Sequence, residues 1–432
     1  MNYGQALEYV RSLSSRGIVP GLDSIRELCK RLGNPQKATK WIHVAGTNGK
    51  GSAVAYITAI LSEAGYRVGC YVSPTIRDYR ERICVNGGMI SKVALAEGMT
   101  LVKEACDAMV SEGLPQPTPF EVETALAFWY FQKKKCDLGV LECGMGGLLD
   151  ATNVIEGTLL EVITSIGMDH MQFLGGSIEK IAAQKAGIIK PGSAVVCMEQ
   201  RGEVLKVIEE KAKKEGASLF ISRSSAATKV QYGLEKQSFH YGKHGKLTIR
   251  LAGKFQIDNA VLAVDACEAL KGLGIRISDE AIREGLLETR WDGRLTVVQK
   301  HPMMVIDGAH NEDAAQKLAK SIEMYFTNRR IIYIMGVLRD KDFDRIIELT
   351  HSYADQIITV TPPENPRALP ALDLAQEVAK VHPSVTAAAS LEEAVEMARL
   401  LADKDDVILA FGSLSYLGKL MDIVGYPAKT PK

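Results

Sequence analysis

The chain has 432 residues, of which 46% are hydrophobic and 24% are charged. This composition is typical of a globular protein and excludes collagen-like, low-complexity and largely disordered chains. The formal net charge is zero, with 52 Lys and Arg against 52 Asp and Glu, so the composition does not favour a nucleic-acid-binding protein.

The eight cysteines are scattered along the chain, and no two have C-x-x-C spacing. This argues against a zinc ribbon or a disulfide framework and favours reduced thiols. Residues 1–17 lack the continuous apolar stretch of a signal peptide, and no apolar run approaches the roughly 20 residues of a membrane helix. We therefore predict a cytoplasmic protein that has neither a membrane nor a nucleic acid as partner.

Short apolar runs alternate with amphipathic segments through the first half of the chain. This alternation is typical of an α/β fold with a parallel sheet that helices cover on both faces. The predicted strands are residues 41–45, 67–72, 138–143, 160–166 and 194–198. The predicted helices are residues 51–64, 119–132, 178–186, 256–270 and 278–287.

Residues 219–251 have a different pattern, because short strand-like pieces alternate with glycines and polar breaks. They predict a small antiparallel addition. Near residue 295 the α/β pattern starts again and continues for about 135 residues, an ordinary domain size. Its predicted strands and helices are residues 303–306, 313–321, 331–335, 343–349, 356–361, 371–381, 391–401 and 406–411.

The sharpest local motif is WIHVAGTNGKGS, residues 41–52. An apolar strand runs into a glycine-rich turn that ends with a lysine at the start of a helix. Glycines let backbone N–H groups point inward, and the lysine and the helix N-terminus add positive charge. This predicts a binding site for nucleotide phosphates. Its residues are Gly46, Thr47, Asn48, Gly49, Lys50, Gly51 and Ser52.

The motif departs from the standard P-loop at two positions. Val44 stands where a glycine is expected, and Gly51 follows the lysine in place of Ser or Thr. The hydroxyl comes one residue later, at Ser52. We therefore expect magnesium ligands to come from other segments.

Three polar residues, Ser73, Glu142 and His170, each follow a predicted strand. Open α/β sheets bind ligands at the carboxyl ends of their strands, and magnesium prefers oxygen ligands. Each residue alone has an ordinary explanation, since a lone Glu is usually solvated and a lone His is usually structural. Their shared place at strand ends makes them candidates. By residue type alone, Lys185 is an ordinary surface lysine.

The second unit opens with WDGRLTVV and MMVIDGAHN. Asp307 and His310 follow a strand, and Arg294 lies at the boundary, where a guanidinium can reach phosphates across a cleft. Asp307 can equally be a turn or helix-capping residue, and His310 can have a capping or packing role.

Ten segments of the chain match motifs of one known family, and they come in the same order as in that family. They are GLDSI (21–25), HVAGTNGKGS (43–52), SPTIRDYRERI (73–83), TPFEVET (118–124), ECGMGGLLDATN (142–153), SIGMDH (165–170), QKAGIIK (184–190), FQIDNA (255–260), GRL (293–295) and DGAHN (307–311). With them the chain resembles folylpolyglutamate synthase and the bifunctional dihydrofolate synthase, members of the Mur-ligase superfamily.

The resemblance implies a monomeric, ATP-dependent ligase that adds L-glutamate to a folate, and also to dihydropteroate, through an acyl phosphate. ADP and phosphate are the implied by-products. It also implies an N-terminal, P-loop ATPase-like domain over residues 1–295, with a mostly parallel sheet and the small antiparallel addition. A C-terminal, Rossmann-like domain that binds glutamate would cover residues 296–432.

The resemblance gives roles to the candidate residues. Lys50 and its loop hold the ATP phosphates, Asn259 and Arg294 contact ATP, and Asp307 and His310 face them across the cleft. The implied ligands of two magnesium ions are Ser73, Glu142, His170 and a carbamylated Lys185. The implied catalytic residues are Lys50, Lys185, His170, His310 and Arg294.

The implied folate-binding surface comes from three segments. Its residues are Gly21, Leu22, Asp23, Ser24, Thr118, Pro119, Phe120, Glu121, Asp150, Ala151, Thr152 and Asn153. The loop after Ser73 departs from the family, because Thr75 and Ile76 stand where an aromatic residue or a His-Leu pair is usual.

Two other enzymatic functions compete with this interpretation, and a binding or scaffold protein without turnover is a third alternative, which the presence of every expected acidic, basic and magnesium position disfavours. One is a different Mur-type ligase, acting on a muramyl peptide or on cyanophycin, which ECGMGGLLDATN and TPFEVET disfavour. The other is a P-loop ATPase or a dinucleotide-dependent oxidoreductase. GMGG after a strand resembles part of a Rossmann motif, but a properly placed G-x-G-x-x-G is missing.

Overall fold

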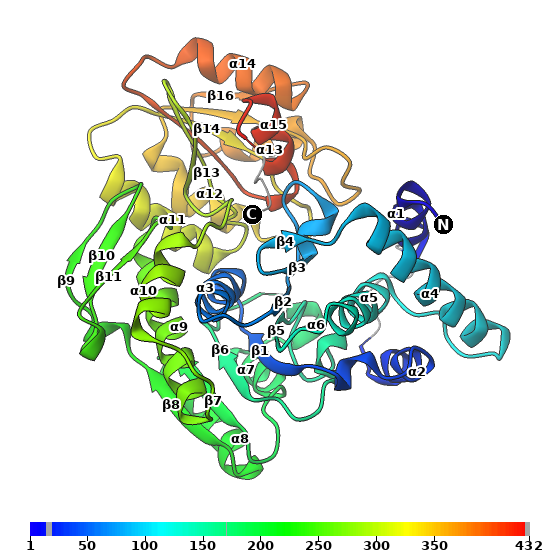
Figure 1. Ribbon diagram of the computed structural model, residues 1–432. Coiled ribbons are helices and arrows are strands. Elements are labelled where there is room, and N and C mark those ends of the chain that lie inside the picture. The colour runs from blue at the N-terminus through cyan, green and yellow to red at the C-terminus, as the bar shows by residue number, and fades with distance from the viewer. Residues whose placement is uncertain (14–19, 170, 428–432) are drawn as a thin grey trace.

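The structure is a computed structural model that describes residues 1–13, 20–169 and 171–427. Within these ranges the chain forms two α/β units, each built on its own sheet, with the second unit above the first in Figure 1. This confirms the predicted α/β class. The candidate ligand His170 lies outside the described residues.

The first unit is built on a large sheet that is parallel except at one edge, where β3 and β4 pair antiparallel. Its strands in spatial order, within the described residues, are β4 (Gly88–Met89), β3 (Ile83–Val85), β2 (Val68–Tyr71), β5 (Leu138–Glu142), β1 (Lys40–Ala45), β6 (Leu160–Ile163), β7 (Ala194–Met198) and β8 (Ser218–Ser222).

Helices cover both faces of this sheet. One face packs on α3 (Lys50–Glu63), α9 (Lys254–Gly272) and α10 (Asp279–Glu288). The other face packs on α1 (Tyr3–Leu13), α2 (Asp23–Arg31), α4 (Lys92–Ser111), α5 (Pro119–Lys133), α7 (Ile178–Ala186) and α8 (Gly202–Glu215). The short α6 (Met171–Leu174) contacts α7. The sheet is thus buried on both sides, as its near-continuous apolar strands predict.

The predicted antiparallel addition is present as a three-stranded sheet of β9 (Thr228–Gln231), β10 (Gln237–His240) and β11 (Lys246–Ile249), at the left of Figure 1. The start of the segment assigned to it is different. Residues 218–222 form β8, which pairs parallel with β7 and extends the large sheet. Short-range pattern does not reveal which partner a strand pairs with, so this part of the prediction was wrong.

The second unit has a sheet that is parallel except for its first strand. Its strands in spatial order, within the described residues, are β12 (Thr296–Lys300), β13 (Met303–Ile306), β17 (Val407–Phe411), β14 (Ile331–Met335), β15 (Gln356–Thr359) and β16 (Val385–Ala387). Because β12 is its first strand, the predicted boundary at residue 295 lies in the segment between α10 and this sheet. The boundary itself stays a prediction.

Helices cover this second sheet on both faces as well. One face packs on α11 (Glu312–Tyr325), α12 (Phe343–Thr350) and α13 (Ala371–Ala379), and the other on α14 (Leu391–Leu401) and α15 (Leu417–Ile423). The described 3-10 helices are η2 (Pro35–Lys37), η3 (Tyr79–Arg82), η4 (Ala151–Val154), η5 (Ser224–Ala226), η6 (Gly242–His244), η7 (His351–Tyr353) and η8 (Leu414–Tyr416).

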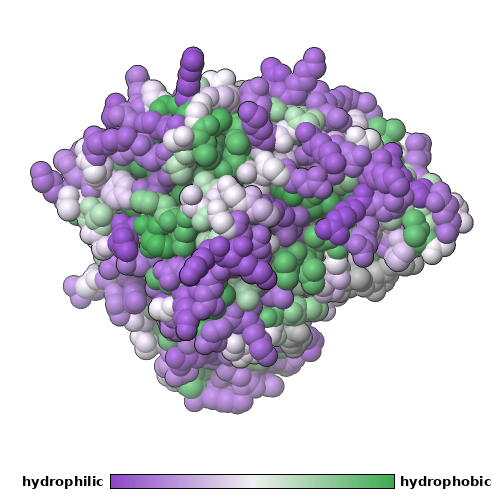
Figure 2. All heavy atoms as spheres, turned by 90° about the horizontal axis from the view of Figure 1, so that it is seen from below, coloured by the Kyte–Doolittle hydropathy of each residue, from purple (hydrophilic) through white to green (hydrophobic). Residues whose placement is uncertain are grey.

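Hydrophobic residues on the face shown in Figure 2 occur in several separate groups among hydrophilic ones. Among the described helices, none combines the length and the hydropathy that crossing a membrane requires. The cysteines form no disulfide within the described residues, and all of them are buried except Cys84, which is partly exposed.

Gly139 in β5 provides a test of core packing. A Cβ atom at this position would lie 2.2 Å from the ring of Trp41, which is itself buried. We expect Gly139→Ala to lower the free energy of unfolding by about 1–3 kcal/mol, because a packed core resists an added methyl group. Thermal denaturation followed by circular dichroism measures this loss.

Gly272→Ala is the matched control. Gly272 ends α9 and has open space around the Cβ position. Alanine is the better helix former, so this variant should be neutral or slightly stabilising. Equal unfolding curves for the two variants would contradict the packing argument.

Candidate active site

Residues 46–52, the predicted phosphate-binding segment and hereafter the phosphate loop, leave the carboxyl end of β1 and curl tightly into the start of α3. Gly46 and Gly49 have φ angles of 156° and 89°. A Cβ atom at Gly46 would lie 1.8 Å from the Thr164 hydroxyl, and one at Gly49 would lie 2.5 Å from Asn259 Oδ1. Only glycine allows this close approach of the backbone.

Lys50 lies over the curled loop. Its Nζ donates to the carbonyl oxygens of Gly46 and Thr47 at 3.2 and 3.1 Å, and Glu142 Oε1 lies 4.0 Å away. Burial raises the pKa of Glu142, while the charge of Lys50 lowers it. The lysine and the carboxylate thus meet at the end of the central strands, as the strand-end argument predicts.

The departure from the standard P-loop has a packing explanation. A Cβ atom at Gly51 would lie 3.0 Å from the indole of Trp291, so this position is kept small. The hydroxyl of Ser52 accepts a hydrogen bond from Gln256 Nε2 at 3.2 Å. Gln256 Oε1 in turn accepts a hydrogen bond from Asn259. Both residues belong to α9, so this helix holds the end of the loop through Ser52.

Its residue type suggests that Lys185 lies on the surface, but the structure buries it, with only 4% of the residue exposed. Its Nζ donates to the Gly46 carbonyl at 2.8 Å. Burial lowers its pKa to about 7, with a further contribution from the charge of Lys50. Ser73 also lies here, and its backbone N–H donates to Glu142 Oε2 at 3.3 Å. Three of the four candidate magnesium ligands therefore surround the loop.

Arg294 and Asp307 lie at the start of the second unit. Asp307 is buried and accepts backbone hydrogen bonds from Leu295 and Ala309, each at 2.9 Å. Burial raises its pKa, and the charge of Arg294 lowers it. Asp307 therefore has the turn role that its sequence position allows, and it also faces a guanidinium.

His310 follows in the same turn. Its Nδ1 lies 2.7 Å from the Gly308 carbonyl, which can only accept, so Nδ1 carries the proton and Nε2 is free to accept one. Desolvation lowers the pKa of His310 to about 4, with a further contribution from the charge of Lys341. The imidazole is therefore neutral near pH 7.

Side chains of the second unit hold the phosphate loop directly. Asn48 Nδ2 donates to Asp313 Oδ2 at 2.8 Å and to Asn311 Oδ1 at 3.2 Å. Asp313 also pairs with Lys317 at 2.6 Å, and Lys317 donates to the Ser165 hydroxyl at 3.2 Å. These residues of α11 link the second unit to the ends of β1 and β6.

A second contact joins the two units nearby. Lys341 Nζ pairs with Asp169 Oδ1 at 2.8 Å, and both side chains are only about one-tenth exposed. Asp169 Oδ2 accepts from Asn311 at 2.9 Å. The contacts at Asn48 and Asp169 therefore converge on the N-terminal end of α11.

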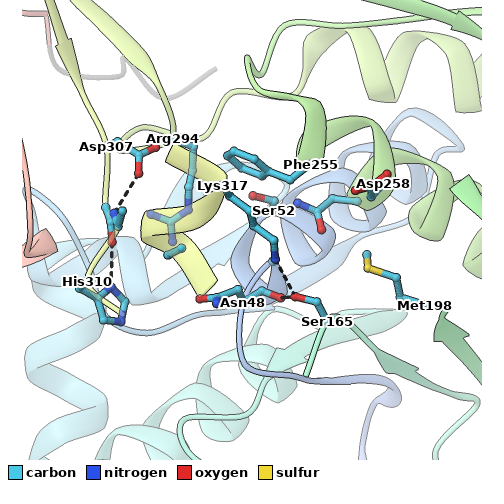
Figure 3. Close-up of a pocket in the computed structure, with 15 residues that line it drawn as sticks. Asn48, Ser52, Ser165, Met198, Phe255, Asp258, Arg294, Asp307, His310 and Lys317 are labelled. Carbon is cyan, nitrogen blue, oxygen red and sulfur yellow. Dashed lines mark hydrogen bonds between the residues drawn. The ribbon is translucent and has the colours of Figure 1, made fainter. Parts of the chain in front are cut away.

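These segments line an open cleft between the two units. In Figure 3, Asp307, Arg294 and His310 lie on one side of it and Ser165 and Met198 on the other. Most of the nucleotide-binding candidates line it. The lining residues are Asn48, Gly49, Ser52, Ser165, Met198, Phe255, Asp258, Asn259, Arg294, Asp307, Gly308, Ala309, His310, Ala314 and Lys317.

The candidate folate residues at the start of α5 have a local structural role. Thr118 and Glu121 form a capping box, in which Thr118 Oγ1 accepts from Glu121 N and Glu121 Oε2 accepts from Thr118 N. Pro119 occupies the first turn, where its missing N–H costs nothing. Phe120 packs against Gly144, since a Cβ atom there would lie 2.6 Å from its ring.

The segment 150–153 lies beside that helix end. Asp150 caps η4 by accepting from Thr152 N, and Ala151 and Thr152 are buried. Asn153 Nδ2 donates to the Leu148 carbonyl at 3.0 Å, and its Oδ1 accepts from Lys190 at 2.7 Å.

The third candidate folate segment begins α2, which contacts both α5 and η4. Gly21 has a φ of 151° and Leu22 is the N-cap. Asp23 is fully exposed and pairs with Arg26 at 3.4 Å, whereas Ser24 Oγ is buried without a hydrogen-bond partner among the described residues. The fold thus brings the three segments to one end of the first unit.

One cluster of His and carboxylate side chains in the described part of the chain has metal-binding spacing, and it lies elsewhere: His244, Glu268 and Asp279. Lys271 pairs with both carboxylates, at 2.8 and 3.2 Å, and Lys243 pairs with Glu268. These ammonium groups already balance the acidic charge, so the cluster is an ion-pair network.

Sequence reasoning missed several residues of the cleft. Asp313 and Lys317 follow the DGAHN motif, but their i,i+4 spacing is also that of a solvated surface pair. Phe255 and Asp258 lie in the FQIDNA motif, which could have indicated them. Nothing near Lys341 in the sequence distinguishes it from a surface lysine.

Comparisons with known proteins agree with this geometry. The Mur ligase middle domain matches residues 44–267, and the Mur ligase glutamate ligase domain matches residues 293–414. The chain is 41% identical over 362 residues to a Bacillus subtilis dihydrofolate synthase/folylpolyglutamate synthase, covering 82% of this chain and 84% of the relative. It is 30% identical to the Escherichia coli protein of the same name, covering 97% and 94%.

Solved structures extend the match over the whole chain. Mycobacterium tuberculosis folylpolyglutamate synthase, complexed with ADP and AMPPCP, has a TM-score of 0.90 at 30% identity and full coverage of both chains. Escherichia coli FolC, in complex with DHPP and ADP, has a TM-score of 0.85 at 30% identity, covering 98% of each. The chain therefore belongs to the folylpolyglutamate synthase and dihydrofolate synthase family of Mur ligases.

Proposed function

We propose that this chain is an ATP-dependent ligase that joins L-glutamate to a folate, and also to dihydropteroate, with release of ADP and phosphate. The observation that carries the proposal is the cleft, in which the phosphate loop of one unit faces Arg294, Asp307 and His310 of the other. Relatives solved with ADP and AMPPCP match both units at once. A monomer in the cytoplasm stays a prediction.

The first chemical step activates a carboxylate. Its oxygen attacks the γ-phosphorus of ATP, and the bond between that phosphorus and the β,γ-bridging oxygen breaks. The products are an acyl phosphate and ADP. Such a transfer depends on positioning and on positive charge. Lys50 supplies charge from the loop, and Arg294 supplies it from the opposite side of the cleft.

The second step forms the amide bond. The α-amine of glutamate attacks the acyl carbon, phosphate leaves, and the nitrogen loses a proton. Glutamate arrives as an ammonium ion, so a base must accept a proton first. We propose His310 for this role, because its Nε2 is the free nitrogen of an imidazole that lines the cleft, and the negative charge of bound phosphates would raise its lowered pKa towards the range that a base needs.

The residues around the loop fit magnesium. The buried carboxylate of Glu142 accepts from the Ser73 backbone N–H at 3.3 Å and lies 4.0 Å from Lys50 Nζ, so Glu142 and Ser73 are both beside the loop and carry the oxygen atoms that magnesium prefers. Bound magnesium would neutralise the phosphate charge. His170, the fourth proposed ligand, lies outside the described residues.

Lys185 fits the proposed carbamate. A pKa of about 7 means that much of this lysine is neutral at physiological pH, and a neutral amine is the form that attacks carbon dioxide. The nitrogen bonds to the carbon and loses a proton, which leaves an anionic group with two oxygens. Such a group would turn a buried cation into a magnesium ligand next to Gly46.

The competing Mur ligases and the P-loop ATPase are less well supported. Relatives at 30–41% identity over most of the chain are named for folate ligation. Hydrolysis of ATP alone also does not require a second unit, whereas here side chains of the second unit bind the phosphate loop directly.

Lys50→Ala tests the phosphate site. We expect turnover to fall at least about 10²–10³-fold, the usual loss when one charge-stabilising donor is removed. The melting temperature should stay close to that of the parent protein. Lys40→Ala is the control, since Lys40 is an exposed lysine at the other end of β1. Full activity of Lys50→Ala would refute the site.

Lys185→Ala tests the carbamate. We expect activity to collapse and to return in part when a short carboxylic acid such as acetate is added, because the acid can occupy the space of the carbamate. The readout is glutamate-dependent phosphate release. Lys180→Ala, an exposed position on the same helix, should keep full activity with or without acetate. A silent Lys185→Ala would contradict the role.

A product assay tests the reaction. Dihydropteroate and tetrahydrofolate are offered separately with ATP and glutamate, and the products are identified by mass spectrometry. We expect one added glutamate on each and phosphate release that depends on glutamate. Phosphate release without glutamate would indicate an ATPase, and conversion of a muramyl precursor instead would indicate a different Mur ligase.

A further inference from the structure

His43 is a buried imidazole that neither half of the proposed mechanism uses. It lies in β1, three residues before the phosphate loop, and is fully inaccessible to solvent. Its Nε2 lies 2.8 Å from Thr152 Oγ1 and 3.0 Å from Cys143 Sγ. Its Nδ1 has no hydrogen-bond partner in the part of the chain that the structure describes.

The hydrogen bonds around Thr152 determine which nitrogen carries the proton. The Thr152 hydroxyl has a single proton and two acceptors other than His43, Asp150 Oδ1 at 2.5 Å and Cys143 Sγ at 3.7 Å, and the much nearer carboxylate takes it. Towards His43 the hydroxyl can therefore only accept, so His43 Nε2 carries the hydrogen and donates it. Burial lowers the pKa of His43 to about 3, and the nearby charge of Lys190 adds to this, so the ring stays neutral.

Asp150 accepts the last hydrogen bond of the series His43–Thr152–Asp150, and it also links two backbone positions of one loop. Its Oδ2 accepts from Met145 N at 2.8 Å, and its Oδ1 accepts from Thr152 N at 3.0 Å. The Asp150 carboxylate thus links residues 145 and 152, which lie near the two ends of the 143–153 loop. One end follows Glu142 directly, and the other holds proposed folate-binding residues.

We propose that His43 is a positioning residue that orients Asp150 through Thr152 and so holds the 143–153 loop in the shape that receives the folate substrate. The assignment rests on the proposed function. His43 belongs to β1, the strand that leads into the phosphate loop. The same strand therefore positions the nucleotide through its carboxyl end and the folate through the side chain of His43. A donor at the Nε2 position is the chemical feature that this role requires.

Two substitutions separate the donor from the ring. The amide nitrogen of glutamine can reach the position of Nε2, whereas that of asparagine reaches only the position of Nδ1. We expect His43→Gln to keep the KM for folate within about threefold of the parent value. We expect His43→Asn to raise it about tenfold, the effect of losing one hydrogen bond. The KM for ATP should change less than about twofold in both.

Thr152 provides a second matched pair that does not depend on how His43 variants fold. Thr152→Ser keeps the hydroxyl, so its KM for folate should stay well below that of Thr152→Val. Thr152→Val keeps the shape without the hydroxyl and should raise the KM for folate as His43→Asn does. The double variant His43→Asn/Thr152→Val should be no worse than the poorer single variant, because both remove the same chain of hydrogen bonds.

Amide hydrogen exchange gives a readout that does not require activity. In the free protein, the Met145 and Thr152 N–H groups should exchange faster in His43→Asn and Thr152→Val than in His43→Gln and Thr152→Ser. This holds even if the parent protein ligates no folate, so the failure of the proposed function would be distinguished from the failure of the positioning role.

A merely structural role predicts different results. It would lower the melting temperature and the active fraction in every variant, with the KM for folate and the exchange at Met145 and Thr152 unchanged. Either that outcome or equal behaviour of His43→Gln and His43→Asn would overturn the proposal.

Discussion

The close approach of the phosphate-loop backbone to the side chains beneath it constrains the whole site. At Gly46 and Gly49 no side chain fits against Thr164 and Asn259. The curl directs the Gly46 carbonyl towards two ammonium groups, those of Lys50 and Lys185. Burial lowers the pKa of Lys185, and the charge of Lys50 on the same acceptor lowers it further. The shape of the loop thus contributes to the chemistry of a residue more than 130 positions away in the chain.

The second unit completes what the first begins. The amide of Asn48 in the loop is held by Asp313 and Asn311, which belong to α11 and its cap. Acyl phosphates are lost to water in an open site, so ligation requires that the two units meet around them. The contact between Asp169 and Lys341 strengthens the same junction from the side of β6.

The sequence predicted those parts of the structure that local patterns determine. Apolar runs located the central strands, and the glycine spacing located the phosphate loop, because both depend on neighbouring residues only. Glu142 and Ser73 followed from a general rule, that ligands bind at the carboxyl ends of parallel strands. The helix bounds of α7 and the strand bounds of β7 agree with the prediction.

Long-range packing determined the rest. Lys185 was indistinguishable from a surface lysine, because the face of a short helix that becomes buried depends on what packs against it. The strand β8 was assigned to the wrong sheet for the same reason. His43 lies within the predicted strand 41–45, and its partner Thr152 is 109 positions further along the chain, beyond the reach of local pattern.

The junction at α11 also limits how such chains can be recombined. A chimaera that takes its second half from a relative would replace Asn311, Asp313 and Lys317 while keeping Asn48 and Ser165 from the original half. The two sets of side chains form one hydrogen-bonded network, so they must be exchanged together. A crossover at residue 295 is compatible with an active hybrid only if the residues at 311, 313 and 317 can form the same hydrogen bonds with Asn48 and Ser165.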